Sequence, residues 1–294
     1  MTNNTLRDIA EEQKTFLDEA FGVFRSKTYN KFIFVEGACD KKFLKKKGFM
    51  EEDYFYLGMC GKDMVISSHY YFKNTYPYNK IDKIAFVIDN DYDHITNRLR
   101  FDNRLFIHSV CKSTKTHYLN DLESYLVNSS ALVQWLDEVG GLTLQQVNIM
   151  KDEVERESRR IGKYRAANEL LKRIKNLPEQ STILFKFDID DFFDHRNFLF
   201  LEKDFESRVK FSSAYKNLVD ELFLLSNRID YECSEKWRLS RGHDVTELIS
   251  IYLFTKFNIN LSSQEIEQYL RLTIDTSELN SYHMYKDLKD FFEI

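Results

Sequence analysis

The chain has 294 residues, of which 43% are hydrophobic and 30% are charged, so it is not a disordered protein and can form one large or two ordinary domains. No apolar stretch is long enough to span a membrane, and a formal net charge of -5 gives no general attraction for nucleic acid. Four scattered cysteines are expected to be reduced thiols in a cytoplasm and exclude a standard zinc knuckle.

The N-terminal third begins with a helix and a buried strand. Apolar residues at helical spacing predict a helix over residues 1–28 that serves packing, not chemistry. The apolar run 32–35 is typical of a strand buried on both faces, and it ends on Glu36. Asp40 is then expected to be the N-cap of a lysine-rich helix over 41–47. Its lysines either form a solvated face or contact phosphate, and they include Lys41, Lys42 and Lys45.

A second strand is predicted at 54–57, followed by a Gly61-Lys62 turn and a helix over 65–72. Such a turn can bring a cation and backbone N–H groups close to a phosphate, which makes Lys62 a candidate. The spacing of a Walker loop is absent, so binding of a nucleoside triphosphate is not indicated.

The most informative stretch is the apolar run 84–88, which is followed by Asp89 and Asp91. Because side chains alternate along an extended chain, both carboxylates are expected on the same side. Neighbouring carboxylates repel each other unless a cation lies between them, and oxygen ligands suit Mg²⁺ or Mn²⁺. The competing interpretation is a solvated acidic turn after a core strand.

A further strand at 104–110 precedes a helix that Asn120 or Asp121 would cap and that carries Glu123 in its first turn. Alternating strands and helices over about residues 30–130 predict an α/β fold with a mostly parallel sheet. Ligands bind such sheets at the carboxyl ends of the strands. The predicted domains are an N-terminal helix (1–29), the sheet domain (30–140) and a helical domain (141–294), with Gly140-Gly141 as the boundary.

The C-terminal half is expected to be mainly α-helical, with one long helix over 143–174 and two final helices near 262–272 and 277–292. The long helix carries a basic strip that is either a solvated face or a nucleic-acid contact, with Arg159, Arg160 and Lys163 as candidates. An acidic cluster could hold a metal or cap a helix; it contains Asp188, Asp190 and Asp191. Asp244 is expected to cap the helix that runs to residue 257, and His243 either faces a site or packs.

Several short motifs together resemble the signature of a TOPRIM domain. In chain order they are Phe-Val-Glu36-Gly37, Gly61-Lys62 and Ile-Asp89-Asn-Asp91. With the downstream motifs Asp121-Leu-Glu123 and Gly242-His243-Asp244, the chain is similar to OLD-like TOPRIM nucleases. These nucleases include effectors of bacterial anti-phage systems such as PARIS.

The resemblance implies a Mg²⁺-dependent (or Mn²⁺-dependent) endonuclease that cuts tRNA, other RNA or DNA. Its metal ligands would be Glu36, Asp89 and Asp91, with Glu123 completing a second position and Lys62 holding phosphate. The resemblance also implies an ABC-type ATPase partner. The basic strip of the long helix could alternatively dock a protein partner or a second copy of the chain. The main alternative is a catalytically silent TOPRIM-like module that senses or binds a protein partner. A topoisomerase would need a tyrosine nucleophile in a further domain, and a phosphoacceptor domain would need paired acids after the first strand.

Overall fold

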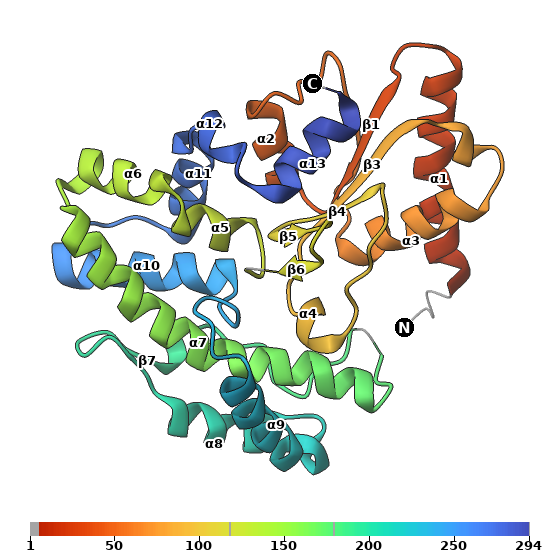
Figure 1. Cartoon of the computed structure of the whole chain (residues 1–294). Helices are drawn as coiled ribbons and strands as arrows, with labels where there is room; N and C mark the ends of the chain where they lie inside the picture. The colour runs from red at the N-terminus through yellow and green to blue at the C-terminus, as the bar shows by residue number, and fades with distance from the viewer. Residues whose placement is uncertain (1–5, 118, 179, 294) are drawn as a thin grey trace. The chain divides into compact units, whose positions relative to one another are not determined.

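The computed structural model describes residues 6–117, 119–178 and 180–293 (Figure 1). Its contacts divide the chain into two compact units, here called unit 1 and unit 2. Unit 1 comprises Met1–Asp89, Arg100–Thr116 and Thr276–Ile294, and unit 2 comprises Asn90–Leu99 and His117–Asp275. Within the described residues, no helix has the length and apolar character needed to cross a membrane.

Unit 1 is built on a four-stranded parallel sheet in the order β2-β1-β3-β4. The strands are β1 (Lys31–Val35), β2 (Phe55–Gly58), β3 (Lys83–Ile88) and β4 (Leu105–Ile107). Almost every residue of β1 and β3 is buried, as expected of central parallel strands that are covered on both faces. The predicted α/β fold with a parallel sheet in the N-terminal half is therefore confirmed.

Helices cover both faces of this sheet. In Figure 1, α1 (Leu6–Arg25) and α3 (Lys62–Asn74) lie on one side, and α2 (Ala38–Lys46) and α13 (His283–Phe292) lie on the other. Residues 1–5 of the predicted N-terminal helix lie outside the described residues, and the helix ends at Arg25. The predicted helix over 277–292 is instead two helices, α12 (Thr276–Leu279) and α13. The remaining short elements of unit 1 are η1 (Tyr78–Lys80) and β5 (Val110–Cys111).

The strand order creates a switch point between β1 and β3. From β1 the chain continues to β2 on one side, whereas β3 and β4 lie on the other side. In open parallel sheets, the carboxyl ends of the two strands at such a point frame the ligand-binding crevice. The residues that directly follow these two strands are Glu36 and Asp89.

Unit 2 is mainly helical, as predicted, and its long helix α7 (Leu144–Ile174) is capped by the Thr143 side chain. Its other α-helices are α4 (Asp93–Thr96), α5 (Leu122–Asn128), α6 (Ser130–Gly140), α8 (Glu202–Ser212), α9 (Val219–Glu232), α10 (Gly242–Phe257) and α11 (Ser263–Thr273). Two 3-10 helices, η2 (Asp190–Phe192) and η3 (Lys216–Leu218), and two short strands, β7 (Phe193–Asp194) and β8 (Leu199–Phe200), complete it. The chain passes from unit 1 to unit 2 between Asp89 and Asn90, and again within β6 (Thr116–His117).

Two sequence predictions need correction in unit 2. Gly141 adopts a left-handed conformation (φ 60°) that terminates α6, so Gly140-Gly141 forms a turn between helices within unit 2 and not a boundary between the units. Asp244 is not the N-cap of α10, because that helix begins at Gly242 with Arg241 as N-cap. The Asp244 carboxylate instead accepts hydrogen bonds from Arg165 Nε (2.6 Å) and Nη2 (2.9 Å).

Candidate functional site

Glu36 and Asp89 meet at the switch point of the unit 1 sheet. The Asp89 backbone N–H donates a hydrogen bond of 2.8 Å to Glu36 Oε1. The Glu36 carbonyl in turn accepts from the N–H of Gly61 at 2.9 Å, immediately before α3. Gly58, with φ 87°, allows the ends of β1 and β2 to approach closely, since a Cβ there would lie 2.6 Å from the Val35 carbonyl oxygen. The predicted acids Glu36 and Asp89 are thus linked by a hydrogen bond from the Asp89 backbone, which holds the Glu36 carboxylate at the end of β3.

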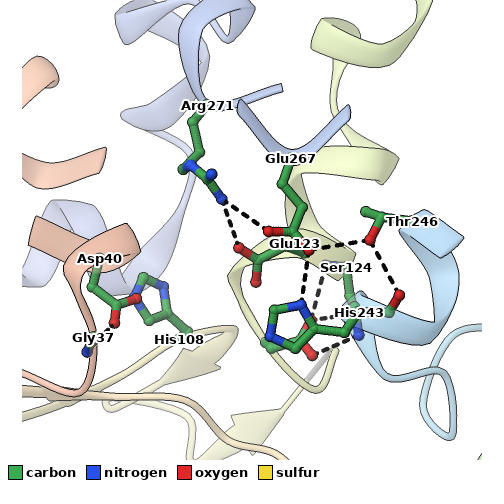
Figure 2. Close-up of polar contacts among 11 residues, drawn as sticks. Gly37, Asp40, His108, Glu123, Ser124, His243, Thr246, Glu267 and Arg271 are labelled. Carbon is green, nitrogen blue, oxygen red and sulfur yellow. Dashed lines mark hydrogen bonds and ion pairs between the residues drawn. The ribbon is translucent and has the colours of Figure 1, made fainter. Parts of the chain in front are cut away.

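Asp40 contributes a third carboxylate to this edge of the sheet. The predicted N-cap role is wrong, because α2 begins at Ala38 and Gly37 is its N-cap. Asp40 lies in the first turn, where its Oδ2 accepts the Gly37 N–H at 2.9 Å (Figure 2). One ligand atom each of Asp40, Asp89 and His108 lies within 4.8 Å of the others.

His108 lies at the end of β4, where its N–H donates to the Ile88 carbonyl at 2.8 Å. Its side chain is fully buried, and Nδ1 lies 2.9 Å from the Tyr282 hydroxyl, which also accepts the Ser109 N–H. Nε2 has no hydrogen-bond partner and lies 3.7 Å from Asp40 Oδ1, too far for a hydrogen bond (Figure 2). Burial lowers the pKa of His108 to about 3, so the imidazole is neutral at pH 7.

Two carboxylates and a neutral imidazole with ligand atoms within 4.8 Å of one another could hold a divalent cation. Sequence reasoning missed Asp40 and His108 as members of the site. His108 could have been found, because it follows a core strand just as Glu36 and Asp89 do. Among the described residues, this is the only group of three or more such side chains with metal-binding spacing.

The predicted lysines of unit 1 differ in their surroundings. Lys62 is the first residue of α3, next to Gly61, and its side chain is half-buried. Lys41 Nζ lies 2.7 Å from the Glu51 carboxylate, and Lys45 forms an ion pair with the same group. Lys42 is exposed. The positive charge of this helix is therefore partly neutralised within the unit.

Asp91 belongs to unit 2, and the backbone turns there. Its φ of 47° is left-handed, so the alternation of an extended strand that placed Asp89 and Asp91 on one side does not apply. The Asp91 N–H donates to the Asn120 carbonyl at 2.6 Å. Burial raises the pKa of the nearby Asp121 carboxyl, and the negative charge of Asp91 adds to the shift.

Glu123 lies in the first turn of α5, and Asp121 is the N-cap, as predicted. The buried Glu123 carboxylate forms an ion pair with Arg271 Nη1 at 3.1 Å (Figure 2). Arg271 also pairs with Glu267 at 3.5 Å. Glu123 thus has a cationic side chain as its partner in unit 2, and its predicted role as a metal ligand stays a prediction.

His243 also takes part in this network of unit 2. Its Nδ1 lies 2.8 Å from Glu267 Oε1, and this contact raises the pKa of His243 to about 9 (Figure 2). His243 therefore links α10 to α11 as a charged partner of Glu267. The His243 side chain is 60% exposed, so this contact decides neither of the two interpretations that the sequence left open.

The acidic cluster near residue 190 is not gathered around one point. Asp188 and Glu247 line an open cavity of about 430 Å³, and burial together with Asp188 raises the pKa of Glu247 to about 8. Asp190 pairs with His195 at 2.8 Å, on the 3-10 helix η2. These separate contacts give no support for a metal site at this cluster.

Three predicted nucleic-acid-binding residues of α7 form ion pairs within unit 2. Arg159 Nε lies 2.7 Å from Asp230, Arg160 contacts Glu157 and Glu202, and Lys163 Nζ lies 2.6 Å from Glu202. Their side chains are 18%, 30% and 10% exposed, so the predicted solvent-exposed strip is wrong for these three residues. The reason is that α8 and α9 supply acidic partners. Binding of nucleic acid by these residues stays a prediction.

No family model, curated protein or solved structure matches this chain. The resemblance to TOPRIM nucleases therefore rests on the short motifs alone.

Proposed function

We propose that the chain is a metal-dependent endonuclease that hydrolyses phosphodiester bonds at the carboxyl edge of the unit 1 sheet. The observation that carries this proposal is the meeting of Glu36 and Asp89 at the β1–β3 switch point, where the Asp89 N–H lies 2.8 Å from Glu36 Oε1. Asp40 and His108 add ligand atoms close to Asp89. The candidate metal ligands therefore lie at the edge of the sheet where parallel α/β sheets bind their ligands.

The donor set fits a divalent cation such as Mg²⁺ or Mn²⁺. Converging carboxylates are costly unless a cation lies between them, and the unpartnered Nε2 of buried His108 lacks a contact that a cation would supply. Asp89 and Asp40 would hold the ion, with Glu36 beside them. A cation bound there would lower the pKa of a water molecule and neutralise negative charge on the phosphate.

The side chains of unit 1 have distinct roles in this proposal. Glu36 accepts a proton from the attacking water as general base, or donates a proton to the leaving oxygen as general acid, and its contact with the Asp89 N–H holds its carboxylate in position. Lys62, at the start of α3, contacts a phosphate oxygen. Asp91 and Glu123 belong to unit 2, and their participation remains the expectation from the TOPRIM resemblance.

The substrate in this proposal is nucleic acid, either tRNA, other RNA or DNA. The resemblance further suggests a toxic effector in anti-phage defence, located in the cytoplasm and held inactive by an ABC-type ATPase. Lys42 is exposed and available for the phosphate backbone, whereas Lys41 and Lys45 would have to exchange Glu51 for phosphate. The four cysteines are unbonded thiols, which fits a reducing compartment.

The alternative is a catalytically silent module that acts through a protein partner. The contacts that favour it are the ion pair between Glu123 and Arg271 and the ion pairs of Lys41 and Lys45 with Glu51. These contacts leave less uncompensated charge for a metal ion or a phosphate. A silent module would keep the fold but would not cut nucleic acid under any metal condition.

Incubation of the purified chain with labelled tRNA and with DNA, in Mg²⁺, in Mn²⁺ and in chelator, tests the proposal. We expect metal-dependent cleavage, and its loss in the double variant Asp89→Asn, Asp91→Asn. Asp82→Asn is the matched control, because Asp82 is an exposed carboxylate just before β3. Undiminished cleavage by the double variant would remove the assignment to this site.

A further inference from the structure

His108 is a buried histidine whose second nitrogen has no partner. Its side chain is 0% exposed, and its Nδ1 contacts the Tyr282 hydroxyl at 2.9 Å. The Ser109 N–H donates to the same hydroxyl at 2.9 Å, so the ring is anchored on its Nδ1 side. Nε2 lies on the other side of the ring and has no hydrogen-bond partner. A buried polar atom without a partner is destabilising, and a bound ion or water would supply the missing contact.

The surroundings of Nε2 indicate what that ligand is. Asp40 Oδ1 lies 3.7 Å away, beyond hydrogen-bond distance, and an Asp89 oxygen lies in the same group within 4.8 Å. Two ligand atoms that each lie about 2.0–2.2 Å from the same transition-metal ion are separated from each other by about 3–4 Å. The distances among the Asp40, Asp89 and His108 ligand atoms are compatible with that separation. The three side chains come from the ends of β3 and β4 and from α2, all within unit 1.

We infer that Asp40, Asp89 and His108 form a mixed oxygen and nitrogen site that selects a first-row transition-metal ion over Mg²⁺. Mg²⁺ prefers an all-oxygen shell and keeps several waters, whereas imidazole nitrogen binds Mn²⁺, Co²⁺ and Zn²⁺. The inference deepens the proposed nuclease function, because it names the ion and a nitrogen ligand at the same sheet edge.

The same unit contains a histidine–carboxylate pair that serves as a matched comparison. His69 Nε2 lies 3.2 Å from Asp102 Oδ1, close enough for a hydrogen bond. Asp102 also pairs with Lys73 at 2.7 Å and accepts the Arg104 N–H at 3.0 Å. Its carboxylate is already satisfied by cationic and N–H donors, so this pair is not expected to bind a metal.

Direct metal binding tests the inference without reference to cleavage. The full chain, freed of metal by a chelator and dialysed, is titrated with Co²⁺ and Mn²⁺ and, separately, with Mg²⁺, by calorimetry. Co²⁺ binding is also followed by its visible absorption, which reports the coordination number and geometry of the ion. We expect affinity to increase from Mg²⁺ to Mn²⁺ to Co²⁺, with Co²⁺ bound at least about tenfold more tightly than Mg²⁺.

Three variants assign the ligands. His108→Gln and Asp40→Asn are each expected to weaken Co²⁺ binding at least about tenfold, whereas His69→Gln leaves it unchanged. Asp40→Asn keeps an oxygen that can accept the Gly37 N–H, so it tests the site even if His108→Gln does not fold. Equal affinity for Mg²⁺ and Co²⁺, or wild-type Co²⁺ binding by Asp40→Asn or by folded His108→Gln, would overturn the inference.

The cleavage assay separates this inference from the proposed function. Selective Co²⁺ binding that depends on Asp40 and His108, without cleavage of any nucleic acid, would support the site and end the nuclease proposal. Suppose instead that cleavage requires Glu36 and that His108→Gln cleaves in Mg²⁺ as well as the wild type does. That result would support the nuclease proposal and overturn the inferred metal selectivity.

Discussion

Replacement of Arg160 by methionine should destabilise unit 2 far more than a surface substitution does. Arg160 Nη1 lies 2.9 Å from Oε2 of Glu157, whose side chain is 0% exposed. The same carboxylate contacts Arg156 Nε at 2.8 Å and accepts the Phe200 N–H at 2.9 Å. Arg160→Met keeps an unbranched apolar stem but removes the guanidinium, so the buried Glu157 carboxylate loses one of its two cations and Glu202 loses one of its partners.

The size of the destabilisation depends on the contacts that the Glu157 carboxylate keeps in the variant. Removing one partner of a fully buried ion pair costs about 3–5 kcal/mol. Arg156 and the Phe200 N–H still contact Glu157, and the Arg160 side chain is 30% exposed, so the loss should be smaller, about 2 kcal/mol. For a domain of this size, that corresponds to a decrease in melting temperature of about 4–8 °C.

Urea and thermal denaturation of the full chain, followed by circular dichroism, measure this loss. The matched control is Arg228→Met, because Arg228 is 71% exposed and pairs with Glu232 on the surface of α9. Because this surface pair is screened by solvent, Arg228→Met should leave the unfolding free energy nearly unchanged. A loss for Arg160→Met that is no larger than for Arg228→Met would refute the buried network. It would also restore the exposed basic strip expected from the sequence.

Two further predictions concern unit 1 and the glycines. Burial alone would raise the pKa of Asp102, but its hydrogen bond from Lys73 and other donors lower it to about 2. At pH 6 the unfolding free energy of Asp102→Asn should therefore be about 1 kcal/mol lower than that of the wild type, after allowance for solvent screening at exposed Lys73. In urea denaturation, this difference should disappear as the pH falls from about 4 to 2. Gly22→Ala, in open space on α1, should raise the unfolding free energy by about 0.5–1 kcal/mol. Gly242→Ala should lower it by about 2 kcal/mol, because the new Cβ would lie 2.4 Å from Asp121 Oδ1; equal melting temperatures of the two variants would contradict this contrast.

The strands of unit 1 could be predicted from the sequence because each is a short apolar run buried on both faces. Two strands that end on acids were enough to place Glu36 and Asp89 at one edge, because parallel strands share their carboxyl end. What could not be predicted is the return of 276–294 to unit 1, where Tyr282 anchors His108. That contact joins residues 174 positions apart, and no local pattern marks it.

The errors at helix ends have a local cause. Asp40 and Asp244 both lie in a first turn, where acids are favoured by the helix dipole as much as they are at the N-cap. A capping residue and a residue of the first turn therefore look alike in sequence. The basic strip on α7 was misjudged for another reason, because its partners Asp230 and Glu202 lie on helices far along the chain.

The most direct test of the nuclease proposal compares single-turnover cleavage by the wild type and by Glu36→Gln at saturating Mn²⁺. The glutamine oxygen can still accept the Asp89 N–H, so the melting temperature should be unchanged while proton transfer is lost. We predict that the wild type cuts nucleic acid only with metal and that Glu36→Gln is at least about 100-fold slower. Cleavage by Glu36→Gln at the wild-type rate, or no cleavage by the wild type with any divalent metal, would contradict the account.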